Sequence, residues 1–148
     1  MPDRFESGSH NALGIAGLCE GVGYILEQGI EALRRHEQQL CAAFLEQTAG
    51  VDGLTVYGPT DPNQRVGVFS VAIDGFEPAE LSAVLEQQFG LLTRPGLHCA
   101  PFAHQSIGTF DQGGTCRFSA GPFTTLADIE AATTALQQIA QQALVHKK

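Results

Sequence analysis

The residues whose types could do chemistry gather in one short run, Arg-Pro-Gly-Leu-His-Cys-Ala-Pro-Phe-Ala-His, which spans residues 94–104. The run contains two histidines, one of the four cysteines and an arginine, and it is punctuated by glycine and proline. Loops of this kind carry binding and catalytic side chains disproportionately often. The residue types allow three kinds of chemistry: a reactive thiol, a metal site, or recognition of an anion.

The thiol interpretation centres on Cys99, which directly follows His98 and precedes His104 by five residues. A nearby imidazolium or guanidinium favours the thiolate, which is the nucleophilic form of cysteine. The structural alternative is that Cys99 is a small buried hydrophobe, as most free cysteines are. We expect Cys99 on an irregular loop, more exposed than Cys19 and Cys41, which we place on the inward faces of helices.

The metal interpretation would use His98, Cys99, His104 and Cys116, because thiolate and imidazole are the ligands that zinc prefers. The spacing does not match a known zinc pattern, since no Cys-x-x-Cys pair is present and adjacent residues point apart in an extended chain. We therefore predict no metal site. A thiol- or metal-binding protein that uses Cys99, His98 and His104 remains an alternative function.

The anion interpretation centres on Arg117, which lies inside the mostly apolar run Thr-Cys-Arg-Phe-Ser at 115–119. A charge in such a strand is costly unless it is paired, and a guanidinium is suited to hold a carboxylate with two parallel hydrogen bonds. An internal ion pair with one of the sixteen acidic residues would explain Arg117 equally well. The polar segment 6–11 precedes a predicted helix, where either phosphate binding or a plain N-cap is possible.

Hydrophobic periodicity predicts the elements that must position these residues. We expect helices over 12–28, 30–47, 78–88 and from a Thr125/Asp128 capping pair to about 145, strands over 54–57, 65–73, 91–93 and 115–119, and an irregular stretch over 94–114. Short strands with helices that can cover one face indicate an α+β fold, a small two-layer sandwich of mostly antiparallel strands covered by helices.

Composition excludes several classes of partner. The chain has 148 residues and a net charge of −8, from eight basic and sixteen acidic side chains. This charge opposes binding to nucleic acid and to anionic lipid. No apolar run reaches the roughly 18–20 residues that span a bilayer, and the charged first residues do not look like a signal peptide. We therefore expect a cytoplasmic protein, with its four cysteines as free thiols.

Three blocks together resemble one family. The runs Arg-Pro-Gly-Leu-His-Cys-Ala-Pro (94–101), Gly-Thr-Cys-Arg-Phe-Ser (114–119) and Phe-Thr-Thr-Leu-Ala-Asp-Ile-Glu (123–130) resemble the C-terminal part of class V aminotransferases, and most of all the cysteine desulfurase-like branch. The opening run Arg-Phe-Glu-Ser-Gly-Ser-His-Asn (4–11) is similar to the segment where the two domains of that family meet. The resemblance implies a junction over 1–11, the C-terminal small domain of a fold type I enzyme over 12–148, and no cofactor-binding large domain in this chain.

The resemblance also implies roles for individual residues. Cys99 matches the cysteine that accepts sulfur as a persulfide, and Arg117 matches the arginine that holds the substrate carboxylate. Gly8 and Ser9 match the pair that reaches the cofactor phosphate of a neighbouring subunit. His98 and His104 are assigned to the substrate-binding site. The sequence departs from the usual desulfurase pattern at Pro95 and Leu97.

In function, the chain resembles part of a pyridoxal-phosphate-dependent transferase or desulfurase that acts on an amino acid such as cysteine. Its only lysines are Lys147 and Lys148, far in sequence from the predicted site. We therefore expect that the chain alone binds no pyridoxal phosphate and is inactive. The resemblance implies a homodimer, and a separate chain could supply the large domain. A non-catalytic protein-interaction domain is the alternative from another class.

Overall fold

The first of two compact units consists mainly of one helix. The computed structural model describes residues 8–146, and the units divide between Arg35 and His36. Helix α1 (Ala12–Gln28) begins at Asn11, whose side chain accepts a hydrogen bond from the Gly14 N–H at 3.0 Å. It ends at Gly29, whose φ of 79° favours glycine. No residue of α1 is buried.

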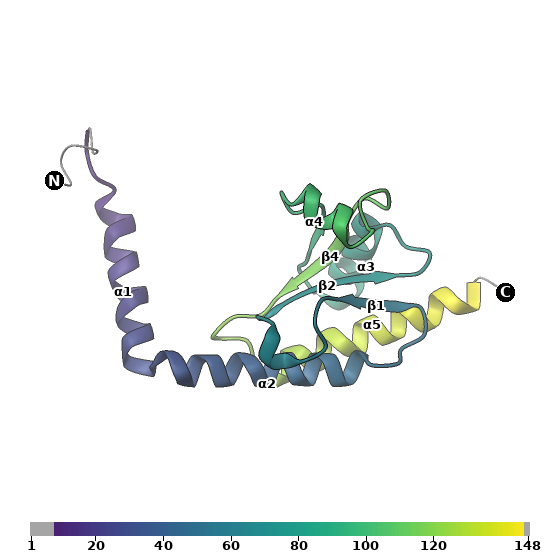
Figure 1. Cartoon of the computed structure of the whole chain (residues 1–148), viewed down its shortest axis with the longest axis horizontal. Helices are drawn as coiled ribbons and strands as arrows, with labels where there is room; N and C mark the ends of the chain where they lie inside the picture. The colour runs from purple at the N-terminus through teal and green to yellow at the C-terminus, as the bar shows by residue number, and fades with distance from the viewer. Residues whose placement is uncertain (1–7, 147–148) are drawn as a thin grey trace. The chain divides into compact units, whose positions relative to one another are not determined.

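The second unit is built on a four-stranded antiparallel sheet with the order β1-β2-β4-β3. Figure 1 labels three of these strands, β1, β2 and β4. Its strands are β1 (Leu54–Tyr57), β2 (Val68–Ile73), β3 (Arg94–Gly96) and β4 (Thr115–Ser119). The helices are α2 (Ile30–Thr48), which begins in the first unit, α3 (Pro78–Phe89), the short α4 (Pro101–Ser106) and α5 (Leu126–His146), and a single 3-10 turn, η2, covers Pro62–Gln64. No helix over residues 8–146 is long and apolar enough to cross a membrane.

The core lies on one face of this sheet. Alternate residues of β2, Phe69, Val71 and Ile73, are buried, as the two-residue period of a strand requires. The Phe44 ring of α2 stacks on Phe69 with ring centroids 3.9 Å apart, and α3 and α5 pack against the strands. The predicted α+β fold, a small two-layer sandwich of antiparallel strands and covering helices, is confirmed.

Two strand boundaries were predicted wrongly. Residues 91–93 form no strand, because Leu91 N bonds Leu85 O at the end of α3 and the Thr93 hydroxyl pairs with that of Ser82. The paired residues are the next three, 94–96. Residues 65–67 do not join β2, because the Arg65 guanidinium donates to the carbonyls of Pro59, Tyr57 and Val68 and fixes a turn there.

Two further expectations need correction. The stretch 94–114 is not wholly irregular, since it contains the three-residue strand β3 and the helix α4. Helix α4 begins at Pro101, and proline suits the first turn of a helix. Cys41 is buried as expected, but Cys19 is exposed, because no residue of α1 is buried.

Candidate functional site

A row of four side chains crosses the sheet on the face opposite the core. Tyr57 pairs with Ser70, Ser70 with Arg117, and Arg117 with Arg94, so one register line joins all four strands. Directly opposed residues of antiparallel strands project from the same face. Because the alternate residue Cys116 is buried in the core, Arg117 and its three partners face away from it. The register thus sets two arginines directly opposite each other on neighbouring strands.

A tight turn follows β3 and carries the candidate thiol. Ala100 N donates to Leu97 O at 2.8 Å, and the two residues between them, His98 and Cys99, have φ values of 54° and 59°. Left-handed backbone costs a residue other than glycine about 1–2 kcal/mol, and such strain tends to occur at functional sites. Cys99 is exposed on this turn, so the expected loop position of the thiol agrees with the structure.

Side chains of Arg94 and His98 hold the turn. His98 Nε2 lies 2.7 Å from the Arg94 carbonyl oxygen, and it donates its proton there because the carbonyl can only accept. The Arg94 guanidinium lies 3.9 Å from Cys99 Sγ, within the range of a weak charge-assisted hydrogen bond to sulfur. The same arginine therefore contacts the turn through both its backbone and its side chain.

The two histidines of the run are neighbours, with ring centroids 5.5 Å apart. His104 is buried, and its Nδ1 lies 2.7 Å from the Thr109 hydroxyl. This hydrogen bond holds the His104 ring in place next to the ring of His98. Burial lowers the pKa of His98; the bond to the Arg94 carbonyl opposes this, and the charges of Arg117, His104 and Arg94 lower the pKa further. Four basic groups thus surround one short turn.

Arg117 shows no ion pair. Its Nε atom is buried without a hydrogen-bond partner in the part of the chain that the structure describes. The internal salt bridge that the sequence allowed for Arg117 is therefore not formed between described residues. A half-buried guanidinium with an unused donor suits an anionic ligand.

The remaining predicted residues are Gly8 and Ser9, which belong to the first unit, and Cys116, which belongs to the core of the second. Gly8 and Ser9 are exposed in the first unit, before α1, and Gly8 has a φ of 97°. Cys116 faces the core with its thiol 3.1 Å from the Thr93 hydroxyl, and burial raises the pKa of this thiol. Among residues 8–146, no three histidine, cysteine or acidic side chains come together as metal ligands.

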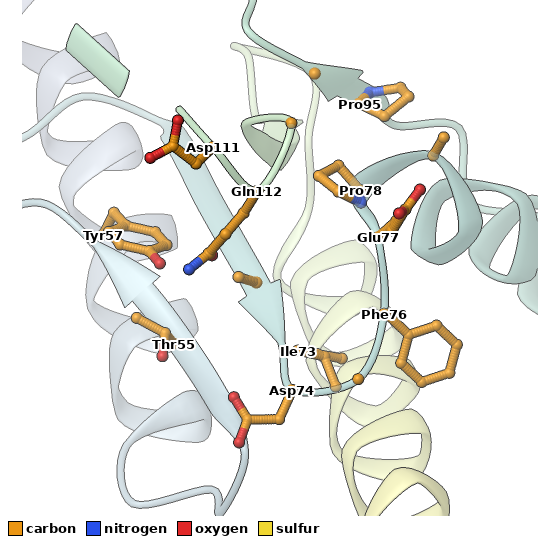
Figure 2. Close-up of a pocket in the computed structure, with 15 residues that line it drawn as sticks. Thr55, Tyr57, Ile73, Asp74, Phe76, Glu77, Pro78, Pro95, Asp111 and Gln112 are labelled. Carbon is orange, nitrogen blue, oxygen red and sulfur yellow. The ribbon is translucent and has the colours of Figure 1, made fainter. Parts of the chain in front are cut away.

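The second unit also contains a groove of about 1030 Å³, shown in Figure 2. Three acidic residues, Asp74, Glu77 and Asp111, line it together with Tyr57 and other neutral residues, and β3 contributes Pro95 and Gly96 to its wall. None of the predicted site residues lines this groove. Tyr57, at the end of the register row that contains both arginines, is the residue that the row shares with this groove.

Sequence reasoning missed three contributors to the cluster. Ser70 and Tyr57 extend the arginine row, but their position depends on strand register, which no local pattern in the sequence reveals. Thr109 bonds the buried His104, although nothing in its sequence context marks it. The alternation of polar and apolar residues in β2 was the one signal that could have placed Ser70 on the open face.

Comparisons with known proteins decide the family. The sequence pattern of the aminotransferase class-V family matches residues 1–132, which is most of the chain. The chain belongs to this family. A probable cysteine desulfurase from Methanothermobacter thermautotrophicus is 29% identical over 140 residues, which cover 95% of this chain and 34% of that protein. A cysteine desulfurase from Yersinia pestis (strain Pestoides F) is 32% identical over 138 residues, 93% of this chain and 32% of its own length.

A solved structure agrees with these sequence matches. The apo cysteine desulfurase from Thermococcus onnurineus NA1 superposes with a TM-score of 0.85 at 27% identity, over 95% of this chain and 34% of that one. This class-V chain thus spans about a third of the length of the relatives that it matches.

The class-V family implies pyridoxal phosphate, which enzymes of this kind bind through a lysine Schiff base. The described residues fit only the edge of such a site. They offer Arg117 with an unused donor and an exposed thiol at Cys99, but they include no lysine, since Lys147 and Lys148 lie outside the described residues. These residues are therefore candidates for contacts with a substrate, and the described part of the chain offers no candidate for the covalent attachment.

Proposed function

We propose that residues 12–148 form the C-terminal small domain of a pyridoxal-phosphate-dependent cysteine desulfurase, with residues 1–11 as the junction to a large domain. The observation that carries this proposal is the exposed Cys99 thiol on a strained turn beside Arg94, His98 and Arg117. An aminotransferase needs no thiol in that place, whereas a desulfurase needs a nucleophile that can accept sulfur. The desulfurases among the relatives support the same choice.

In this proposal each residue of the cluster has one role. Arg117 binds the carboxylate of the substrate amino acid through the donor that it leaves unused in this structure. His98 lines the substrate site, and His104 orients His98 from its buried position. In the complete dimeric enzyme, Gly8 and Ser9 contact the cofactor phosphate of the neighbouring subunit.

The sulfur transfer balances without an added oxidant. Cys99 as thiolate attacks the substrate sulfur, a sulfur–sulfur bond forms, the carbon–sulfur bond of the substrate breaks, and the electron pair of that bond remains with the substrate carbon, which then takes a proton. The overall change is Cys99–SH plus cysteine giving Cys99–S–SH plus alanine. Pyridoxal phosphate, when it is bound in the complete enzyme, supplies the electron sink for this chemistry.

The complete enzyme is proposed to be a cytoplasmic homodimer. Free thiols persist in the reducing cytoplasm, and all four cysteines of the described chain are free. A two-fold dimer is the commonest closed assembly, and the phosphate contact proposed for Gly8 and Ser9 requires a second subunit. The large domain can come from the same polypeptide or from a separate chain.

The test is a chimera in which residues 8–148 replace the corresponding third of the Methanothermobacter relative. We expect it to bind pyridoxal phosphate, to form alanine from cysteine, and to leave a persulfide on Cys99 that mass spectrometry detects. Cys99→Ala should abolish alanine formation while cofactor absorbance stays. Alanine formation that survives Cys99→Ala, or a folded chimera that binds the cofactor and forms no alanine, would contradict the proposal.

A second measurement uses the 148-residue chain by itself. Mixed with pyridoxal phosphate, it should show no stable aldimine absorbance, because its only lysines are the last two residues. A stable band that disappears in the Lys147→Ala/Lys148→Ala double variant would contradict the assignment of cofactor attachment to another domain.

A further inference from the structure

Arg94 and Arg117 form an unusual cross-strand pair. They lie directly opposite each other on β3 and β4, with the same charge and on the same face. Like charges in this arrangement destabilise a sheet unless an anion compensates them. Neither guanidinium pairs with a carboxylate in the described part of the chain. If Arg117 binds the substrate carboxylate, as proposed above, Arg94 still lacks an anionic partner.

The candidate anion beside Arg94 is a sulfur atom. Its guanidinium nitrogen lies 3.9 Å from Cys99 Sγ. The thiol of Cys99 is neutral when protonated, but it becomes an anion when it ionises, and it remains one as a persulfide. A contact that is weak to the thiol would therefore strengthen in the states that react.

Backbone contacts on both sides fix the position of the Arg94 backbone, from which its side chain extends. Residues 94–96 pair with 115–117 of β4, and the Arg94 carbonyl accepts the proton of His98 Nε2 at 2.7 Å. Arg94 is thus anchored at the strand and at the turn whose third residue is Cys99. Arg35 on α2 is also exposed, but it lies inside a helix and is not part of a strand pair or a turn.

We propose that Arg94 is a positioning residue for the sulfur of Cys99, which holds this sulfur as an anion, first as the thiolate and then as the persulfide formed by sulfur transfer. The part of this inference that concerns the persulfide rests on the proposed function. The part that concerns the thiolate does not, because the contact between Arg94 and the Cys99 sulfur is present in this chain by itself. The two arginines then have different roles: Arg94 contacts the sulfur of Cys99, and Arg117 binds the substrate carboxylate.

The test is the alkylation rate of Cys99 in the full chain, measured with iodoacetamide between pH 6 and 11 and resolved by mass mapping. Two unit charges about 4 Å apart in water interact by about 1 kcal/mol, so Arg94→Gln should slow Cys99 about five-fold at pH 7. The rate difference between Arg94→Gln and the parent chain should be large at pH 7 and small at pH 11. Arg94→Lys should restore most of the rate at pH 7.

Three controls separate a specific contact from other causes. The exposed Cys19 serves as an internal reference, since its rate should not change in any variant. Arg35→Gln removes the same charge from an exposed site and should leave Cys99 unchanged. Arg117→Gln should slow Cys99 less than Arg94→Gln does, because no contact joins Arg117 to the sulfur.

Three outcomes would overturn the inference. Equal alkylation rates of Cys99 in the parent chain and in Arg94→Gln would show that Arg94 has no electrostatic effect on the sulfur. If Arg94→Gln lowers the alkylation rate by the same factor at pH 7 and pH 11, Arg94 only shapes the turn. If Arg117→Gln lowers the rate as much as Arg94→Gln does, the effect comes from the positive charge of the whole region and not from the Arg94 contact. Because this experiment uses no cofactor, a failed chimera would refute the desulfurase proposal and leave the thiolate result intact.

Discussion

His98 lies in surroundings that disfavour its charged form. It is half-buried, and Arg117, His104 and Arg94 all bring positive charge toward it. Burial is the largest cause of its lowered pKa, and the bond to the Arg94 carbonyl is the one effect that favours the imidazolium. A neutral His98 still donates this bond through Nε2, so the turn keeps its hydrogen bond without the charge.

The lowered pKa of His98 predicts how stability depends on pH. Because the unfolded chain binds a proton at His98 more readily than the folded chain does, the free energy of unfolding should fall as the pH drops below about 6.5. His98→Gln should flatten this slope between pH 6.5 and 5, as urea denaturation can measure. An unchanged slope in His98→Gln would contradict the prediction.

At this scale the sequence predicted the candidate residues but not their geometry. The clustering of Arg94, His98, Cys99 and His104 in one run was visible, and the charge inside a mostly apolar strand marked Arg117. The two consecutive left-handed residues at His98 and Cys99 were not predictable, because cysteine does not favour this backbone and glycine or asparagine would be expected in such a turn. The burial of His104 depends on a bond to Thr109 that only the fold creates.

At the scale of elements, two glycines allow β3 and β4 to approach each other. Gly114 is buried with a φ of 99°, and a Cβ on it would collide with the carbonyl oxygen of Gly96. Gly96, with a φ of 106°, ends β3 directly before the turn that carries Cys99. The close contact between these backbones therefore sets where the turn begins.

A matched pair of alanine variants tests this contact. Gly108→Ala introduces a side chain into open space at a φ of 74° and should cost about 1 kcal/mol. Gly114→Ala adds a collision to the same backbone penalty and should cost about 3 kcal/mol or more in urea denaturation. Equal losses in the two variants would show that the Gly96 contact does not matter.

The sequence predicted the four long helices and the strands β1 and β4, but it missed the short elements β3 and α4 and the start of β2. Helices α1, α2, α3 and α5 appear close to the predicted ranges, because each contains several turns of apolar spacing. Strand β3 has only three residues, two of them proline and glycine, so its pairing depends on Gly114 across the sheet and not on local propensity. The predicted start of β2 was wrong because the Arg65 side chain bonds nearby backbone carbonyls, at Pro59 and Val68, and holds a turn in place of strand pairing.

For the whole molecule, the exposed apolar residues of α1 are the most conspicuous surface feature. Ile15, Leu18, Val22, Ile25 and Leu26 follow helical spacing along one side of α1, and each is at least 43% exposed. Exposed apolar surface of this kind marks an interaction site or a tendency to associate. The family relation was accessible from sequence at this scale, since the matched blocks extend along nearly the whole chain.

We predict that the purified 148-residue chain self-associates through this side of α1, most simply as a dimer. Leu18→Glu combined with Val22→Glu should shift it toward monomer in light scattering at high concentration. Leu13→Glu is the control, because Leu13 is 88% exposed but lies on another side of the helix. A parent chain that remains monomeric, or a Leu13→Glu variant that dissociates equally, would contradict the prediction.

The basic cluster also affects how small anions reach Cys99. The molecule has a net charge of −8, yet Arg94, His98, His104 and Arg117 surround the site. An approaching anion is repelled at long range and attracted only in the last few ångströms. Salt screens long distances first, since the Debye length is about 10 Å at 0.1 M. Moderate ionic strength should therefore speed the encounter of an anionic substrate with this site, and only higher salt should weaken its retention there.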